Sequence, residues 1–168
     1  RIYSRLPFSH ICLVPTTFIP RYVFASTNTI ARLGLPSFIT RITSAFGMRT
    51  HPITGIYKLH TGTDIGAPMG ASFIAANDGI VTYAGYNGAY GNMVIVDHGG
   101  GITTLYAHGS EILTEIGAIV TQGTPVLKVG STGYSTGPHA HFEIRINGQT
   151  VNPENYLLQS NFIKKDNT

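Results

Sequence analysis

Residues 139–146 read His-Ala-His-Phe-Glu-Ile-Arg-Ile, and this stretch decides the fold class. Polar and apolar side chains alternate along it with a period of two, which is the pattern of a β-strand with one buried face. The apolar face consists of residues 140, 142, 144 and 146, and we expect it to pack in a core. The opposite face lines a groove or meets solvent, and it carries His139, His141, Glu143 and Arg145.

Short apolar runs separated by glycine-rich turns continue on both sides of this stretch, from about Ser37 onward. The predicted strands are residues 74–76, 80–84, 93–96, 103–107, 125–129 and 142–146. The dipeptides Asn87-Gly88 and Asn147-Gly148 favour hairpin turns because both residue types tolerate left-handed backbone conformations. Only residues 153–159 and 27–33 have modest helical character. The chain is therefore predicted to be all-β, with few short helices.

The composition supports this interpretation and excludes several other classes. A chain of 168 residues is long enough for one domain with a core and too short for two ordinary ones. With 42% hydrophobic and 11% charged residues it lacks the signature of disorder. The single cysteine, Cys12, excludes an intrachain disulfide and a cysteine-based zinc site. No stretch of the sequence reaches the roughly 18–20 apolar residues that span a bilayer, so we do not expect a membrane-spanning segment.

The distribution of charged residues, prolines and glycines divides the chain into three parts. Residues 1–36 contain four prolines and no clear period, and we interpret them as an N-terminal extension of unknown role. Residues 37–157 form the predicted domain, and residues 158–168 form a C-terminal tail. The sequence starts without an initiator methionine or a standard signal peptide, so a processed chain is expected.

Basic residues are concentrated in the first part of the sequence. Residues 1–63 contain seven Lys or Arg and no acidic residue. Such a basic half favours an anionic partner, for example a bacterial wall polymer. The seven cations are scattered singly and form no run that could follow a phosphate backbone, so no nucleic-acid partner is expected.

Three fragments carry residues suited to metal chemistry. His139 and His141 share one strand face, and His108 ends the strand-like run Thr-Thr-Leu-Tyr-Ala-His. The third fragment is His60-Thr-Gly-Thr-Asp64. A zinc peptidase site needs nitrogen or oxygen ligands about 2.0–2.2 Å from the metal and one position left open for water. Spacing alone leaves open which histidine binds metal and which transfers protons.

The third fragment can contribute two ligands only if the chain bends sharply. In a straight strand the Cα atoms of His60 and Asp64 would lie about 13 Å apart, at roughly 3.3 Å per residue. Gly62 between them makes a curl possible. Each fragment alone is short enough to occur by chance.

The ordered set of motifs is much more specific than any one of them. Its members are Phe46-Gly-Met-Arg-Thr-His-Pro-Ile-Thr-Gly55, His60-Thr-Gly-Thr-Asp-Ile-Gly-Ala-Pro68, Tyr106-Ala-His108 and Ser131-Thr-Gly-Tyr-Ser-Thr-Gly-Pro-His-Ala-His-Phe-Glu143. In this order they resemble the lysostaphin-type (LytM-like) zinc metalloendopeptidases, from about residue 37 to residue 157. The resemblance implies a mainly antiparallel β-sheet domain with a substrate groove.

The resemblance also implies the roles of five residues. One Zn²⁺ per chain would be held by His60, Asp64 and His141. His108 and His139 would be the catalytic pair beside the water nucleophile. One of them would take the proton of the water, and the other would stabilise the oxyanion or protonate the leaving amine.

Several neighbouring positions depart from the family pattern or have two interpretations. Gly109 and Ala140 stand where family members more often have leucine, and neither change removes a functional atom. Glu143 shares the histidine face, where it either orients an imidazole or is a plain surface carboxylate. His51 is interpreted as a structural turn residue. Tyrosines are expected near the groove, where an extended peptide would bind, and the candidates are Tyr57, Tyr86, Tyr90 and Tyr134.

The expected function is that of a secreted or envelope-facing zinc endopeptidase. Its partners would be bacterial peptidoglycan peptides, cut either in a cross-bridge or in the stem peptide. The alternative is a catalytically silent or latent scaffold or regulator of the same fold that binds the cell wall or a partner protein. Retention of all five site residues favours the enzyme. Residues 1–36 could cover the groove and hold such an enzyme latent.

Overall fold

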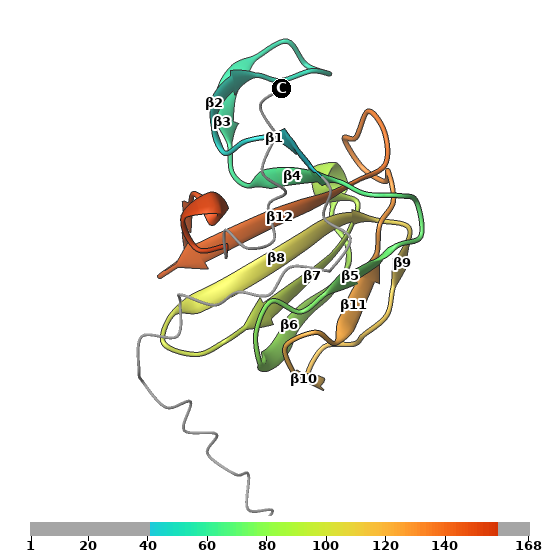
Figure 1. Ribbon diagram of the computed structural model, residues 1–168, viewed down its shortest axis with the longest axis vertical. Helices are drawn as coiled ribbons and strands as arrows, with labels where there is room; N and C mark the ends of the chain where they lie inside the picture. The colour runs from blue at the N-terminus through green and yellow to red at the C-terminus, as the bar shows by residue number, and fades with distance from the viewer. Residues whose placement is uncertain (1–40, 158–168) are drawn as a thin grey trace, which may run out of the picture.

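A computed structural model describes residues 41–157, whose regular secondary structure is almost entirely β-strand (Figure 1). In this part of the chain two short 3-10 helices, η2 (Gly88–Tyr90) and η3 (Pro153–Asn155), accompany the strands. The strands are β1 (Arg41–Ser44), β2 (Gly47–Thr50), β3 (Tyr57–His60), β4 (Thr63–Gly66), β5 (Ser72–Ile74), β6 (Gly79–Tyr86), β7 (Asn92–Asp97), β8 (Ile102–Gly109), β9 (Glu111–Ile112), β10 (Ile119–Val120), β11 (Pro125–Lys128), β12 (His139–Ile146) and β13 (Gln149–Val151).

The main sheet has the strand order β1-β4-β12-β8-β7-β6-β10, with β13 paired to β12, and every pair is antiparallel. Strand β12 therefore lies between β4 and β8. In this register His141 is opposite Asp64 on β4 and opposite Ala107 on β8. The sheet thus brings together three motifs that are far apart in the sequence.

A second, three-stranded sheet (β5-β11-β9) packs against the main sheet, and the core lies between them. The apolar face of β12 contributes Phe142 and Ile144, both completely buried. The ring of Phe142 packs against Tyr106 and Phe73 with centroid separations of 5.5 and 6.1 Å. Burying a side chain such as Phe142 stabilises the fold by about 1.5–3 kcal/mol. This packing fixes β12 and, with it, the histidines on its other face.

A third sheet consists of the hairpin β2–β3 alone, which projects from one end of the main sheet (Figure 1). Its strands are joined by a turn in which the backbone amide of Gly55 donates to the carbonyl oxygen of His51, at 2.9 Å. Nδ1 of His51 accepts the amides of Ile53 and Thr54 at 3.3 and 3.2 Å. The prediction that His51 is a turn residue is confirmed.

The predicted all-β class with a mainly antiparallel sheet is confirmed. Five of the six predicted strands fall largely within β6, β7, β8, β11 and β12, whereas the run 74–76 meets β5 only at Ile74. The Asn147-Gly148 pair forms the β12–β13 turn with φ angles of 50° and 81°. No helix among residues 41–157 is long and apolar enough to cross a membrane.

The helix predicted at residues 153–159 is wrong over the part that the structure describes. Only the 3-10 turn Pro153–Asn155 forms. It is started by Asn152, whose side chain accepts the amide of Glu154 at 3.0 Å, as N-cap residues do. Leu157, which follows, is 4% exposed and packs in the core. The other helix candidate, residues 27–33, the extension 1–36 and the tail 158–168 lie outside the described residues.

Candidate metal centre and catalytic groove

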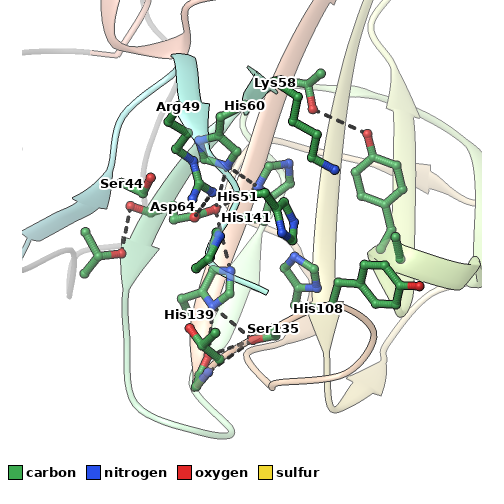
Figure 2. Close-up of a pocket in the computed structure, with 18 of the residues that line it drawn as sticks. Ser44, Arg49, His51, Lys58, His60, Asp64, His108, Ser135, His139 and His141 are labelled. Atoms are coloured by element: carbon green, nitrogen blue, oxygen red, sulfur yellow. Dashed lines mark hydrogen bonds and ion pairs between the residues drawn. The ribbon is translucent and has the colours of Figure 1, made fainter. Parts of the chain in front are cut away.

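Three of the predicted site residues meet at one point beside the main sheet (Figure 2). His60 ends β3, Asp64 lies in β4 and His141 lies in β12. Oδ1 of Asp64 is 2.7 Å from Nδ1 of His141 and 3.2 Å from Nε2 of His60. The two imidazole nitrogens are 3.3 Å apart. One ligand atom from each residue therefore falls within 4.8 Å of the other two, which suits a single metal ion.

The sharp bend between His60 and Asp64 is present and depends on Gly62. A Cβ atom at this position would collide with the carbonyl oxygen of Phe142 on the neighbouring strand. Only glycine allows the backbone to approach so closely. The predicted curl at Gly62 is confirmed, and it brings two residues of one short fragment to the same point.

Hydrogen bonds on the far side of each ring select the nitrogen that faces the centre. Nδ1 of His60 donates to the carbonyl oxygen of Ala45 at 2.8 Å, which leaves the lone pair of Nε2 facing Asp64. Nε2 of His141 donates to Oε1 of Glu143 at 3.2 Å, which leaves the lone pair of Nδ1 facing Asp64. Two oriented imidazole lone pairs and one carboxylate are the donor set of a catalytic zinc site with an open position. The residues present therefore fit the metal that the sequence predicts.

The carboxylate at the centre is held in its charged form. Burial acts to raise the pKa of Asp64, but hydrogen bonds from the imidazoles of His141 and His60 in their protonated forms outweigh it and hold the pKa well below its usual range. A metal ion would take the place of those protons and bind the lone pairs that they leave. An ionised carboxylate is the form that binds a cation.

His108 and His139 lie next to this centre without belonging to the three-residue cluster. Their ring centroids are 4.8 Å apart, and the ring of His108 is 5.6 Å from that of His141. Nδ1 of His108 donates to the carbonyl oxygen of Thr132, and Nδ1 of His139 donates to that of Gly137, each at 2.8 Å. In its neutral form each ring therefore carries a free lone pair on Nε2.

The backbone and the surroundings of His108 are both unusual. Its φ angle is 61°, a left-handed value that costs a non-glycine residue free energy and often marks a functional site. Burial lowers the pKa of His108 to about 4, helped by the neighbouring His141 and His139, although the Thr132 carbonyl opposes the shift. His108 is therefore neutral near pH 7 and able to accept a proton.

These side chains line one groove of about 600 Å³. Tyr90 and Tyr134 line it as expected. The expectation is wrong for Tyr57 and Tyr86, which do not line it and are 67% and 64% exposed. Tyr57 alternates with Lys58 along β3 and so points to the opposite face of the hairpin.

Glu143 is not a surface carboxylate, although the sequence allowed that interpretation. Its side chain is completely buried. Besides His141, it accepts hydrogen bonds from Thr61 (2.5 Å), Tyr90 (2.8 Å) and Arg145 (2.6 and 2.8 Å). Burial acts to raise the pKa of Glu143, but the bonds from His141 and Thr61 lower it to about 2. The ionised carboxylate thus orients the imidazole of His141.

We expect the Glu143→Gln variant to bind zinc about 10–100-fold more weakly, because outer partners of metal ligands contribute that much to affinity. The variant keeps the side-chain volume but loses the charge that holds Nε2–H of His141. The measurement is a zinc titration against a chromophoric chelator. Glu111→Gln removes a charge from an exposed pair with Lys128 and serves as the control. Equal zinc affinity in both variants would contradict the orienting role.

The two departures from the family pattern fit their surroundings. A Cβ atom at Gly109 would collide with the side chain of Leu127, which occupies that space. Ala140 is 4% exposed within the core. Sequence reasoning missed Arg49 and Lys58 as groove residues, although Arg49 lies in one of the motifs quoted above. Their signal is the alternation along β2 and β3, strands too short to recognise beforehand.

Comparison with known proteins places this geometry in context. The model of Peptidase family M23 matches residues 58–153. The DD-carboxypeptidase/endopeptidase Mpg of Neisseria meningitidis is 50% identical over 123 residues, which cover 73% of this chain and 28% of that protein. The chain thus spans less than a third of the length of this curated relative.

Solved structures agree with the fold. A zinc-containing peptidase from Vibrio cholerae has a TM-score of 0.63 and 36% identity, covering 67% of this chain and 35% of that one. The catalytic domain of lysostaphin from Staphylococcus simulans has a TM-score of 0.63 and 27% identity, covering 70% and 91%. The SpoIIQ–SpoIIIAH pore-forming complex matches with a TM-score of 0.66 and 28% identity, covering 83% and 99%.

Proposed function

Because this chain belongs to peptidase family M23, we propose that residues 37–157 are a zinc metallopeptidase domain that hydrolyses peptide bonds in bacterial peptidoglycan. The observation that carries the proposal is the meeting of His60, Asp64 and His141 at one end of a groove. The 50% identity to a protein named DD-carboxypeptidase/endopeptidase further supports a bond between two D-residues as the target. Peptidoglycan lies outside the cytoplasmic membrane, so the proposed site of action is extracytoplasmic, either secreted or in the cell envelope.

The five site residues divide into two groups by where their donor atoms point. His60 Nε2, the Asp64 carboxylate and His141 Nδ1 would hold the zinc, as their lone pairs converge. When bound, zinc supplies Lewis-acid activation of a water molecule and polarises the scissile carbonyl group.

The remaining two histidines would transfer protons. His108 and His139 both present an unprotonated Nε2 when neutral, because Nδ1 of each is bound to a carbonyl oxygen. One ring takes the proton of the attacking water, and a ring that carries a proton donates it to the leaving amine or to the oxyanion. Their separation of 4.8 Å between ring centroids allows both to reach the same scissile bond.

The alternative is a scaffold that uses the same fold to bind the cell wall or a partner protein. The fold alone does not separate the two functions, since the SpoIIQ–SpoIIIAH complex is as similar in shape as the peptidases are. The oriented lone pairs favour hydrolysis, because a scaffold needs neither a converging donor set nor a strained histidine beside it.

The proposal predicts that the protein splits purified muropeptide dimers joined by a DD cross-link into monomers. The products are identified by mass spectrometry, and dimers joined by an LD cross-link serve as the control substrate. A chelator should abolish the splitting and added zinc should restore it. Splitting of neither dimer by the zinc-loaded protein would favour the scaffold.

A further inference from the structure

One face of the β2–β3 hairpin carries a concentration of basic side chains. Arg49 and Lys58 are directly opposite each other in the register of the hairpin, so both project from the same face. His60, two residues further along β3, continues this face, and His51 follows β2 in the turn. All four line the groove (Figure 2). We call Arg49 and Lys58 the basic pair.

The basic pair lacks adequate charge compensation in the described part of the chain. Like charges directly opposite each other on a two-stranded ribbon are destabilising. Lys58 forms no ion pair with any residue of 41–157. The single ion pair of Arg49 within this range is a long one to Asp64, at 3.5 Å, and its Nε atom is buried there without a hydrogen-bond acceptor.

No other carboxylate in the groove balances these charges. Asp64 is the only acidic residue among the described residues that line it, and Asp64 belongs to the proposed zinc site. The pKa of His51 is lowered first by burial and then by the positive charges of Lys58 and Arg49. The groove therefore carries positive charge that a bound anion from outside the described chain would balance.

The position of the pair limits where that anion lies. Nη2 of Arg49 is 3.5 Å from Oδ2 of Asp64, the carboxylate proposed to hold the zinc. One residue of extended peptide spans about 3.3–3.6 Å. An anion bound by Arg49 therefore belongs to a residue that adjoins the scissile bond.

The proposed substrates carry such an anion. A bond between two D-centres places the carboxylate of the second centre next to the scissile nitrogen. This holds for a chain-terminal residue and for a cross-linking diamino acid that joins through its D-centre amine. Both activities in the name DD-carboxypeptidase/endopeptidase thus share a free α-carboxylate on the leaving residue.

We propose that Arg49 and Lys58 form a carboxylate subsite that binds the α-carboxylate of the leaving residue. The inference rests on the proposed function and specifies its substrate class. Arginine offers a planar pair of N–H donors that matches a carboxylate, and lysine adds a second charge from the opposite strand. The same subsite would serve carboxypeptidase and endopeptidase substrates alike.

The test compares two peptides, acyl-D-Ala-D-Ala with a free carboxylate and the same peptide as its C-terminal carboxamide. Charged hydrogen bonds of this kind correspond to about 10–100-fold in affinity, so the unmodified protein should show at least a tenfold higher kcat/KM for the free acid. In Lys58→Gln and Arg49→Gln this preference should fall toward one, because kcat/KM for the free acid drops by a much larger factor than kcat/KM for the carboxamide. Arg49→Lys should lose part of the preference, because it keeps the charge without the paired donors.

Two controls make the outcome specific. Lys128→Gln removes one positive charge from an exposed pair on β11, away from the groove, and should keep the full preference. Zinc content is measured for both Arg49 variants, because Arg49 contacts Asp64.

Equal rates on both peptides, or an equal loss on both peptides in the Lys58 and Arg49 variants, would overturn the subsite. Failure of the zinc-loaded protein to cleave either peptide or the DD-linked dimer would instead contradict the proposed function, and the subsite with it.

Discussion

Replacing His141 with alanine is expected to remove bound zinc and peptidase activity together. His141 is 4% exposed, and its Nδ1 lies 2.7 Å from the Asp64 carboxylate at the centre of the cluster. Removing it leaves two protein ligands where a catalytic zinc site uses three. The loss of zinc affinity should exceed the roughly 100-fold that an outer partner contributes, and activity should fall with it. Zinc per chain is measured by elemental analysis after dialysis, alongside cleavage of the DD-linked dimer.

A second buried histidine separates metal loss from general destabilisation. His98 is 7% exposed and is held by the carbonyl oxygen of Asp78 and the hydroxyl of Thr104, at 2.7 and 2.8 Å. It does not line the groove. His98→Gln should lower the melting temperature and leave zinc content unchanged. If His141→Ala kept a full equivalent of zinc, His141 would have to be removed from the proposed ligand set.

Alanine at His108 or His139 is expected to lower peptidase activity while zinc stays bound. Both rings lie beside the cluster, with Nε2 of His139 3.6 Å from Oδ1 of Asp64, and neither belongs to the three-residue group that converges on one point. Zinc content should stay near one per chain. Activity should fall about 10²–10⁴-fold, the usual contribution of a positioned acid or base. Elemental analysis and kcat/KM on the same protein preparations provide both quantities.

The outcomes for His108 and His139 distinguish three roles. Loss of zinc together with activity would make the residue a ligand. Activity within about tenfold of the unmodified protein would exclude it from proton transfer. A further distinction comes from the backbone, because relief of the left-handed conformation at His108 stabilises the fold. The His108→Gly variant should therefore melt higher than His108→Ala while being equally inactive.

The parts of the fold that the sequence predicts are those with a local physical cause. Strand β12 alternates in sequence because one face packs on Phe73 and Tyr106 while the other places His139 and His141 in the groove, as predicted. The resemblance to lysostaphin-type peptidases is confirmed by the family match and by the lysostaphin structure. The assignment of ligand and proton-transfer roles among the histidines stays a prediction, which the variants above test.

Features that depend on contacts distant in the sequence could not be predicted. The burial of Glu143 follows from Thr61 and Tyr90, which approach it from 82 and 53 positions away in the sequence. The basic pair is visible only once the register places Arg49 opposite Lys58. The helix predicted from Pro153 is only the 3-10 turn Pro153–Asn155, a length that local propensity does not determine.

We propose that a metal held by His60, Asp64 and His141 lets this protein hydrolyse peptidoglycan. The most direct test is the release of new amino termini from intact, purified peptidoglycan, with and without a zinc chelator. We expect release that stops with the chelator, resumes with added zinc and exposes the amine of a D-centre. Release that continues in the chelator, or none from several wall types despite one bound zinc per chain, would contradict the proposal.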